Sequence, residues 1–320
     1  RPGRPSWKRA SLLTPPSTPA CPTNITTRVY DCDVVEPPRA PRSPRTESRE
    51  IVELQALRTS RPELREAIDL QIEILELYRR VQGRVPVPWI EISTTHVTQN
   101  AETGRPLVTF DAIPVELTDL RLLVRQTAEA MRRHGVLDDS DHARVQALGR
   151  DMGLLVAVGK WYRTTSEQHV DLPSREPDDE DPVLGQVLTL AMRPFLSRCA
   201  EVVQQRPELS SWTCGHCAVC GGDPDFSVIT AAGDRLLICG RCGLQWAFDA
   251  SVCPFCRTTP SRISSFATPD GKYRVEACDA CRRYVKAYDV RKGGRPVMPL
   301  VDSIVTLTLD AAAMQRGYVG

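Results

Sequence analysis

The chain has 320 residues, of which 41% are hydrophobic and 25% charged. It is long enough for two or three domains with real hydrophobic cores, which excludes a disordered polymer. A formal net charge of +1 excludes a global attraction to nucleic acid or to an anionic membrane, although it leaves room for a local basic patch. No apolar run approaches the ~20 residues of a membrane span, and the basic N-terminus lacks the apolar stretch of a secretory signal. We expect a cytoplasmic protein without membrane insertion.

Residues 1–48 contain ten of the 26 prolines, together with many Ser, Thr and Arg residues. Proline removes backbone hydrogen-bond donors, and the segment offers few apolar side chains for burial. The composition therefore predicts an extended or disordered tail.

Residues 49–210 are predicted to form a helical domain. Ser60, followed by Pro62 and Glu63, resembles a capping box at the start of a helix, and apolar residues follow at helical spacing. Residues 82–115 are rich in Pro and Gly and predict a long irregular connection.

Three more helices are expected in this domain, where apolar residues recur at helical spacing and a cap or glycine marks an end. They lie over about 117–134, 140–162 and 182–205. Pro194 should kink the last helix, since proline lacks the N–H and clashes with the preceding turn. An acidic loop is predicted over 171–182.

From residue 211 short alternating runs replace the helical period. Two strand-like runs flank Ala-Ala-Gly-Asp, which is a hairpin signal, and a third run follows; the same pattern then recurs. The runs are 226–230, 235–238, 244–248, 262–267, 272–277 and 284–290. We predict an α+β protein in which two tandem rubredoxin-like or zinc-ribbon β modules, 211–250 and 251–298, follow the helical domain. A closing segment, 299–320, should contain a helix over about 300–315.

Nine of the 12 cysteines fall between positions 214 and 281, and eight of them form Cys-x-x-Cys pairs. Repeated pairs of this kind indicate thiolate ligation in a reducing compartment rather than disulfides. Two such turns supply four sulfurs in a tetrahedron. The paired residues are Cys217/Cys220, Cys239/Cys242, Cys253/Cys256 and Cys278/Cys281.

Loop length predicts which pairs share an ion. Gaps of 18 and 21 residues, each containing one hairpin, follow the first and third pairs, whereas only ten residues separate the second pair from the third. We therefore expect one site from Cys217, Cys220, Cys239 and Cys242, and another from Cys253, Cys256, Cys278 and Cys281. A nested pairing is the main alternative.

The residue after the second cysteine of such a turn often needs a positive φ, which glycine adopts without strain. Gly221 and Gly243 meet this need in the first module. Arg257 and Arg282 occupy the same positions in the second, where each should cost about 1 kcal/mol. These arginines could instead offset the charge of a tetrathiolate site.

Tetrahedral sulfur coordination suits two ions of either zinc or iron. Structural zinc contributes on the order of 10 kcal/mol of folding free energy per site, enough to order a small β region. Iron would add one-electron chemistry. Thiol–disulfide exchange is a weaker alternative, because four pairs together resemble ligands rather than catalysts.

Cys214 and His216 precede the first pair and are interpreted as bystanders, with alternate ligands as the other possibility. Cys199 should be buried in a helix, and Cys21 and Cys32 have no evident role. The five histidines form no ligand pair, and no nucleophile elbow or phosphate-binding loop is present, so we assign no catalytic or cofactor-binding residue.

Charge argues against a nucleic-acid ligand for the β modules. Residues 214–290 contain nine Lys or Arg and eight Asp or Glu, and two tetrathiolate zinc sites would add −4 in total. The region would then be net negative, which disfavours general nucleic-acid binding.

Four cysteine segments and the C-terminus resemble the formate dehydrogenase accessory protein (FdhE) family. The matching segments are Cys217-Ala-Val-Cys220-Gly221-Gly222-Asp223-Pro224, Leu237-Ile-Cys239-Gly-Arg-Cys242-Gly-Leu-Gln-Trp246, Cys253-Pro-Phe-Cys256, Glu276-Ala-Cys278-Asp-Ala-Cys281-Arg-Arg-Tyr284-Val-Lys286 and Val301-Asp302 through Gly317-Tyr318. The resemblance covers about 211–320 well and 49–210 loosely, and it does not extend to 1–48.

The resemblance implies a cytoplasmic, non-enzymatic assembly chaperone with rubredoxin-like metal sites. Its partner would be the molybdenum-containing catalytic subunit of formate dehydrogenase, and a homodimer is compatible with it. Two other functions compete with this hypothesis. One is a rubredoxin-like iron protein that transfers electrons, and the other is a zinc-ribbon nucleic-acid binder.

Overall fold

A computed structural model describes residues 48–166 and 181–320. The predicted tail over 1–48 and the acidic loop over 171–182 fall almost wholly outside these residues, as do Cys21 and Cys32. Among the described helices, none is both long enough and apolar enough to cross a bilayer.

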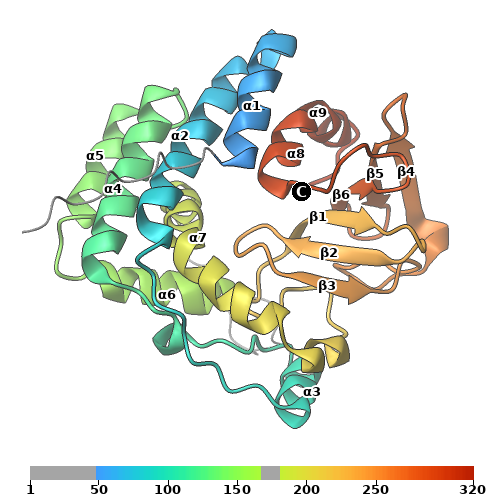
Figure 1. Cartoon of the computed structure of the whole chain (residues 1–320), viewed down its shortest axis with the longest axis horizontal. Coiled ribbons are helices and arrows are strands. Elements are labelled where there is room, and N and C mark those ends of the chain that lie inside the picture. The colour runs from blue at the N-terminus through green and yellow to red at the C-terminus, as the bar shows by residue number, and fades with distance from the viewer. Residues whose placement is uncertain (1–47, 167–180) are drawn as a thin grey trace, which may run out of the picture. The chain divides into compact units, whose positions relative to one another are not determined.

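The part before residue 211 is helical, as predicted (Figure 1). Side-chain oxygens of Ser48, Ser93, Asp138 and Asp181 accept hydrogen bonds from backbone N–H groups in the first helical turns, which fixes four of the helix starts. The helices are α1 (Arg49–Ser60), α2 (Arg65–Gln82), α3 (Thr94–Thr103), α4 (Leu117–Arg133), α5 (Asp139–Leu148), α6 (Leu154–Ser166) and α7 (Pro182–Gln204), with short 3₁₀ turns η1 (Pro62–Leu64), η2 (Phe110–Ala112) and η3 (Pro207–Ser211).

The capping box predicted at Ser60 is wrong. Ser60 is the last residue of α1, and its hydroxyl donates back to the carbonyls of Ala56 and Leu57. Pro62 disfavours helical backbone at the residue before it, so the chain breaks there and α2 begins at Arg65 without a side-chain cap.

Two other boundaries differ from expectation. The irregular connection over 82–115 contains α3, a polar helix in which only Val97 is buried, so it carries almost no hydrophobic periodicity. The single helix expected over 140–162 is two helices, α5 and α6, separated by Gly149 to Gly153. By contrast, α4 and α7 lie where predicted, and α4 ends before Gly135 at φ +71°. The kink at Pro194 stays a prediction.

Six strands form one sheet in the order β3-β2-β1-β6-β5-β4. Each predicted module supplies three consecutive antiparallel strands, and the two halves join through a parallel pairing of β1 with β6, from Phe226 opposite Lys286 to Ile229 opposite Asp289. The strands are β1 (Pro224–Ile229), β2 (Arg235–Cys239), β3 (Gln245–Phe248), β4 (Ile263–Ala267), β5 (Tyr273–Cys278) and β6 (Tyr284–Asp289); a short 3₁₀ turn, η4 (Pro260–Arg262), precedes β4.

The closing helix is divided at Thr306 into α8 (Pro299–Val305) and α9 (Leu307–Gln315), which lie beside the sheet (Figure 1). Asp302 of α8 is fully buried and binds the Tyr273 hydroxyl at 2.7 Å and the Arg295 guanidinium at 2.6 Å. Arg295 also pairs with Glu53 of α1 at 3.1 Å. This network fastens the sheet, the C-terminal helices and α1 to one another.

Hydrophobic packing joins the helices to the first module. The larger buried cluster runs from the helices, and includes Phe195 of α7, to Trp246 and the four cysteines of the first quartet. A second cluster packs one part of the sheet, including Phe226 and Tyr288, against Leu309 of α9. The first quartet therefore lies inside the main core.

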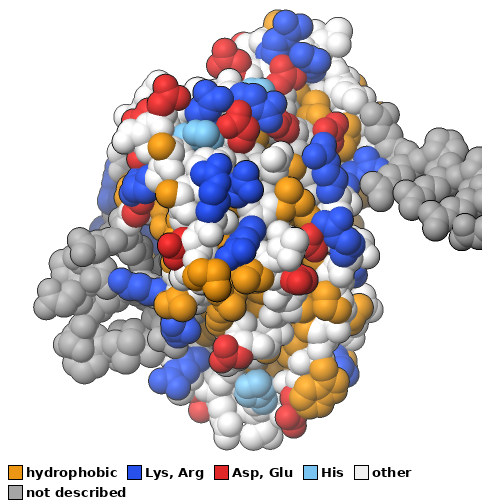
Figure 2. Space-filling model, turned by 90° about the vertical axis from the view of Figure 1, so that its left-hand side faces the viewer, with side chains coloured by type: hydrophobic (Ala, Val, Ile, Leu, Met, Phe, Trp, Pro, Cys, Tyr) orange, Lys and Arg blue, Asp and Glu red, His pale blue; other side chains and the backbone are white. Residues whose placement is uncertain are grey.

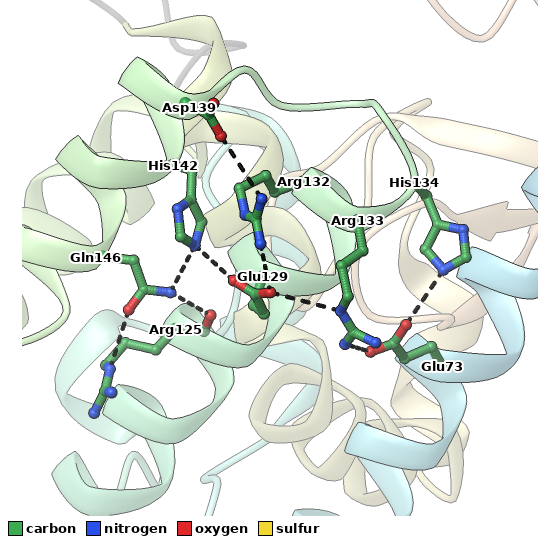
Figure 3. Close-up of polar contacts among 9 residues, drawn as sticks. All are labelled: Glu73, Arg125, Glu129, Arg132, Arg133, His134, Asp139, His142 and Gln146. Carbon is green, nitrogen blue, oxygen red and sulfur yellow. Dashed lines mark hydrogen bonds and ion pairs between the residues drawn. The ribbon is translucent and has the colours of Figure 1, made fainter.

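Polar contacts join α2, α4 and α5 to one another (Figure 3). Glu129 of α4 accepts from Arg132 at 3.0 Å and lies 2.9 Å from Nε2 of His142 on α5. Glu73 of α2 contacts Arg133 and His134 at the end of α4. These contacts fix how the helices pack but involve no residue of the cysteine quartets.

Candidate metal centres

The structure brings together the two quartets that loop length predicts, and the nested pairing does not occur. In each quartet the four sulfurs lie within 4.8 Å of one another. Sulfurs from opposite turns are 3.4 Å apart in Cys217–Cys242 and 3.5 Å apart in Cys220–Cys239. The corresponding distances in the second quartet are 3.8 Å for Cys253–Cys281 and 3.6 Å for Cys256–Cys278.

These distances fit a single ion. Four sulfurs placed tetrahedrally about 2.3 Å from zinc would be ~3.8 Å apart. The donor set, four thiols and no oxygen or nitrogen, suits zinc or iron and disfavours magnesium or calcium. The residues present therefore fit a tetrathiolate ion at each site.

The four Cys-x-x-Cys turns have the same backbone hydrogen bonds. In each, the N–H of the first cysteine donates to the carbonyl five residues later, and the N–H four residues later donates back to the first cysteine's carbonyl. The distances are 2.9 and 2.9 Å from Cys217, 3.0 and 3.1 Å from Cys239, 3.1 and 2.9 Å from Cys253, and 2.8 and 2.9 Å from Cys278. This repeated turn directs both sulfurs to one side of the chain.

The closing residue of each turn is left-handed, as the sequence predicts. Gly221 and Gly243 have φ of +65° and +79°. Arg257 and Arg282 have φ of +57° and +60°, and they are the non-glycine residues with positive φ in the described part of the chain. A left-handed side chain costs roughly 1–2 kcal/mol, so both arginines sit in strained turns.

Both arginines contact neighbouring segments rather than a sulfur. The Arg257 guanidinium donates to the Thr213 carbonyl at 3.0 Å, just before the first quartet. Arg282 donates to the Arg316 carbonyl at 2.5 Å, and its guanidinium carbon lies 4.1 Å from the centre of the Tyr318 ring. They therefore connect the second quartet to the first and to the C-terminus.

Burial separates the two sites. All four cysteines of the first quartet are buried, and Arg193 of α7 donates to the Gly240 carbonyl inside one of its turns at 2.6 Å. In the second quartet Cys253 and Cys278 are buried, Cys281 is half-buried and Cys256 is exposed. The first site belongs to the core, whereas the second opens to solvent.

Burial opposes the ionisation of two thiols in the first quartet. Burial raises the pKa of Cys217 and of Cys242 well above that of an ordinary thiol. Burial would raise the pKa of Cys239 too, yet hydrogen bonds from the other three thiols hold it well below the ordinary value. Desolvation therefore opposes the ionisation of Cys217 and Cys242 in the bare quartet, and a divalent ion would offset that cost.

An ion pair bridges the two sites. Asp223, two residues after the first turn closes at Gly221, lies 2.8 Å from Arg283 beside the last turn. The Arg283 guanidinium carbon is 3.8 Å from the centre of the Phe255 ring, which lies between Cys253 and Cys256. Sequence reasoning did not identify this bridge, and an acid 60 positions from its partner offers no local signal.

Cys214 and His216 lie outside both quartets. The Cys214 thiol donates to the Ala101 carbonyl at 3.2 Å, and His216 packs edge-on against Trp212. Cys199 is buried in α7, as expected, and burial raises its pKa to about 12. None of these side chains joins a cluster of potential metal ligands among the described residues.

The arrangement defines a helical scaffold with one six-stranded sheet that carries two tetracysteine sites. A comparison with family models gives no match. Curated relatives are the FdhE homologs of Haemophilus ducreyi and Stutzerimonas stutzeri. The Haemophilus ducreyi homolog is 31% identical over 126 residues, which cover 37% of this chain and 41% of the homolog. The Stutzerimonas stutzeri homolog is 29% identical over 189 residues, which cover 54% of this chain and 59% of the homolog. The chain thus spans less than two thirds of either relative.

The fold extends the similarity over most of the chain. The crystal structure of the FdhE protein from Pseudomonas aeruginosa matches with a TM-score of 0.57 at 17% identity, covering 84% of this chain and 91% of that one. The resemblance to the FdhE family predicted from the cysteine segments is confirmed by these relatives and this fold. The predicted α+β fold class is confirmed as well.

Proposed function

We propose that this protein is a non-enzymatic accessory protein for the assembly of formate dehydrogenase and acts in the cytoplasm. The observation that carries the proposal is the pair of tetracysteine sites within an FdhE-like fold. Eight of the ten described cysteines belong to the two quartets of potential metal ligands. The other two, Cys199 and Cys214, have a pKa raised by burial, which makes each a poor nucleophile.

The eight quartet cysteines would hold two ions, zinc or iron, and these ions would stabilise the sheet by linking its turns. In each module the ion joins the turn before the first hairpin strand to the turn after the second. Each structural ion would contribute on the order of 10 kcal/mol to folding. The two β modules would then form a rigid surface that stays ordered while the formate dehydrogenase subunit bound to it is still immature.

An apolar surface patch beside the helices supports a role in binding another protein. Met152, Leu155 and Val156, at the start of α6, are 86%, 40% and 73% exposed. Figure 2 shows apolar side chains gathered near mid-height on the face it presents, with Lys, Arg, Asp and Glu side chains around them. Apolar patches bordered by charged residues mark protein-binding sites.

Arginines make the edge of this patch cationic. Arg121 donates to the Asp151 carbonyl at 3.2 Å and lies 3.8 Å from the Met152 sulfur. Arg125, one turn further along α4, donates to the Gln146 side chain at 3.2 Å. Because both contact neutral acceptors, their charges remain available to an acidic partner. We infer that the immature catalytic subunit of formate dehydrogenase presents apolar side chains with acidic neighbours to this patch.

The test is capture of the catalytic subunit by tagged protein, with Val156→Asp as the perturbation and Val87→Asp as the control. Val87 is also exposed, at 69%, but lies between α2 and α3. Wild type and Val87→Asp should retrieve the subunit, and Val156→Asp should retrieve at least tenfold less. If Val156→Asp captures as much subunit as wild type, the binding surface lies elsewhere on the protein. If wild type retrieves no subunit and deletion of the gene leaves formate oxidation intact, the accessory function is wrong.

Electron transfer is the second candidate, because the exposure of Cys256 brings the second site to the surface. This function requires iron there. A coloured protein with a reversible one-electron reduction at the second site would support it. A colourless protein with two zinc ions would exclude it.

A further inference from the structure

A cavity of about 800 Å³ lies between α6 and α7, within the usual size range of ligand pockets. Its walls are mainly apolar. The side chains that define them are Leu70, Met131, Val136, Trp161, Leu184 and Leu190. The walls come from four different segments of the helical part, so this is a site of the tertiary structure rather than a feature of one helix.

Arg241, a residue of the first candidate metal centre, also lines this cavity. It lies between Cys239 and Cys242, and its backbone N–H donates to the Cys239 sulfur at 3.4 Å. Its guanidinium carbon is 5.6 Å from the centre of the Trp161 ring in the cavity wall. The Arg241 side chain therefore reaches from the metal turn to the apolar cavity.

The Arg241 guanidinium lines the cavity and has no hydrogen-bond acceptor or ion-pair partner among the described residues; its Nη1 atom is buried, and the side chain as a whole is half-buried. A half-buried cation without an acceptor is costly, so the accessible part of the guanidinium favours an acceptor brought by a ligand. Lys160 adds a second positive charge at the exposed side of the cavity.

One acidic residue and two threonines around the cavity already have hydrogen-bond or ion-pair partners. Asp181 pairs with Arg144 and accepts from the N–H groups of Val183 and Leu184 at 3.1 Å. The Thr165 and Thr189 hydroxyls donate at 2.8 Å to carbonyls of their own helices. The unbalanced charge that faces the cavity is therefore positive.

We propose that this cavity binds a small amphiphile that has an apolar body and one anionic group, and that the anion binds Arg241. The apolar walls take the body, and the guanidinium supplies the charge-assisted hydrogen bonds. Because Arg241 belongs to a cysteine turn, the ligand contacts the first metal centre through this side chain. Met152, Leu155 and Val156 do not line this cavity, so different variants test the two proposals.

The probes are decanoate, decanol and decyltrimethylammonium, each titrated calorimetrically into the metal-loaded chain. Decanoate should bind at least tenfold more tightly than decanol, which has the same tail without the charge, and the cation should bind more weakly still. No binding of decanoate at millimolar concentration, or equal affinity for all three probes, would overturn the proposal.

Two variants locate the ligand. Arg241→Met keeps the apolar stem and the backbone N–H, so it should retain the metal and lose the preference for decanoate over decanol. Arg163→Met, on the exposed face of α6, is the matched control and should keep that preference. Gly185→Leu fills the cavity without touching the metal centre, since a Cβ there meets only Trp161 at 3.9 Å. Gly185→Leu should weaken the binding of decanoate and of decanol by similar factors. If the binding of the probes is unchanged in either Arg241→Met or Gly185→Leu, the ligand binds elsewhere.

Discussion

Two alanine substitutions in the first metal module separate backbone strain from packing. Gly221 and Gly243 close equivalent turns with similar left-handed backbones, at φ of +65° and +79°. A Cβ at Gly243 would lie 3.8 Å from the nearest atom, in Arg193, whereas a Cβ at Gly221 would lie 2.2 Å from the Ser166 carbonyl oxygen. The same change therefore adds strain at both positions and a backbone clash at only one.

The magnitudes follow from this geometry. Left-handed backbone costs alanine about 1–2 kcal/mol, of which the stiffer unfolded chain offsets roughly 0.5 kcal/mol. Gly243→Ala should thus lower the free energy of unfolding by about 1 kcal/mol. Gly221→Ala must also displace the end of α6, and overpacking of this kind costs roughly a further 1–3 kcal/mol.

Urea unfolding of the metal-loaded proteins, at one fixed concentration of free metal, measures both changes. Arg257→Gly is an internal check, because it relieves the left-handed strain but loses the hydrogen bond to Thr213, and its net effect should be small. Equal losses for Gly221→Ala and Gly243→Ala would show that α6 does not pack on the first turn as described.

Three further experiments address the sites and the C-terminus. Cys239→Ser should reduce bound metal from two ions to one and loosen the main core, whereas Cys256→Ser should lose one ion and leave the helices intact. Elemental analysis measures the bound metal and circular dichroism the helix content. Retention of two ions by either variant would contradict the prediction. A chromogenic chelator should remove the ion at the exposed second site faster than the ion at the buried first site, and a single release rate would count against that difference in burial. Asp302→Ala should lower the free energy of unfolding by about 3–5 kcal/mol, because it leaves the Arg295 guanidinium without its buried partner. Thermal unfolding measures this change. A loss below about 1 kcal/mol would show that the contacts of Asp302 do not stabilise the fold as described.

Local chemistry made part of this structure predictable. The spacing of Cys217, Cys239, Cys253 and Cys278 from their partner cysteines, with one hairpin in each long gap, was enough to predict which sulfurs meet. The left-handed residues followed from the turn itself, even where Arg257 replaced glycine. That ions bind at the quartets stays a prediction.

Long-range contacts were not predictable in the same way. The parallel pairing of β1 with β6 joins residues 60 positions apart, and nothing in either strand specifies its partner. The α3 helix was missed because its stability depends on the Ser93 cap and the turn at Gly104 rather than on an apolar face. Asp302 is buried only because Arg295 and Tyr273 converge on it from other elements.

Native mass spectrometry of the purified chain, with a thiol count on the same sample, tests whether the sulfurs serve as ligands. We expect a folded protein that carries two zinc or iron ions and has all eight quartet cysteines reduced. A folded chain without bound metal, or one whose quartet sulfurs are joined as disulfides, would contradict the proposed role of both sites.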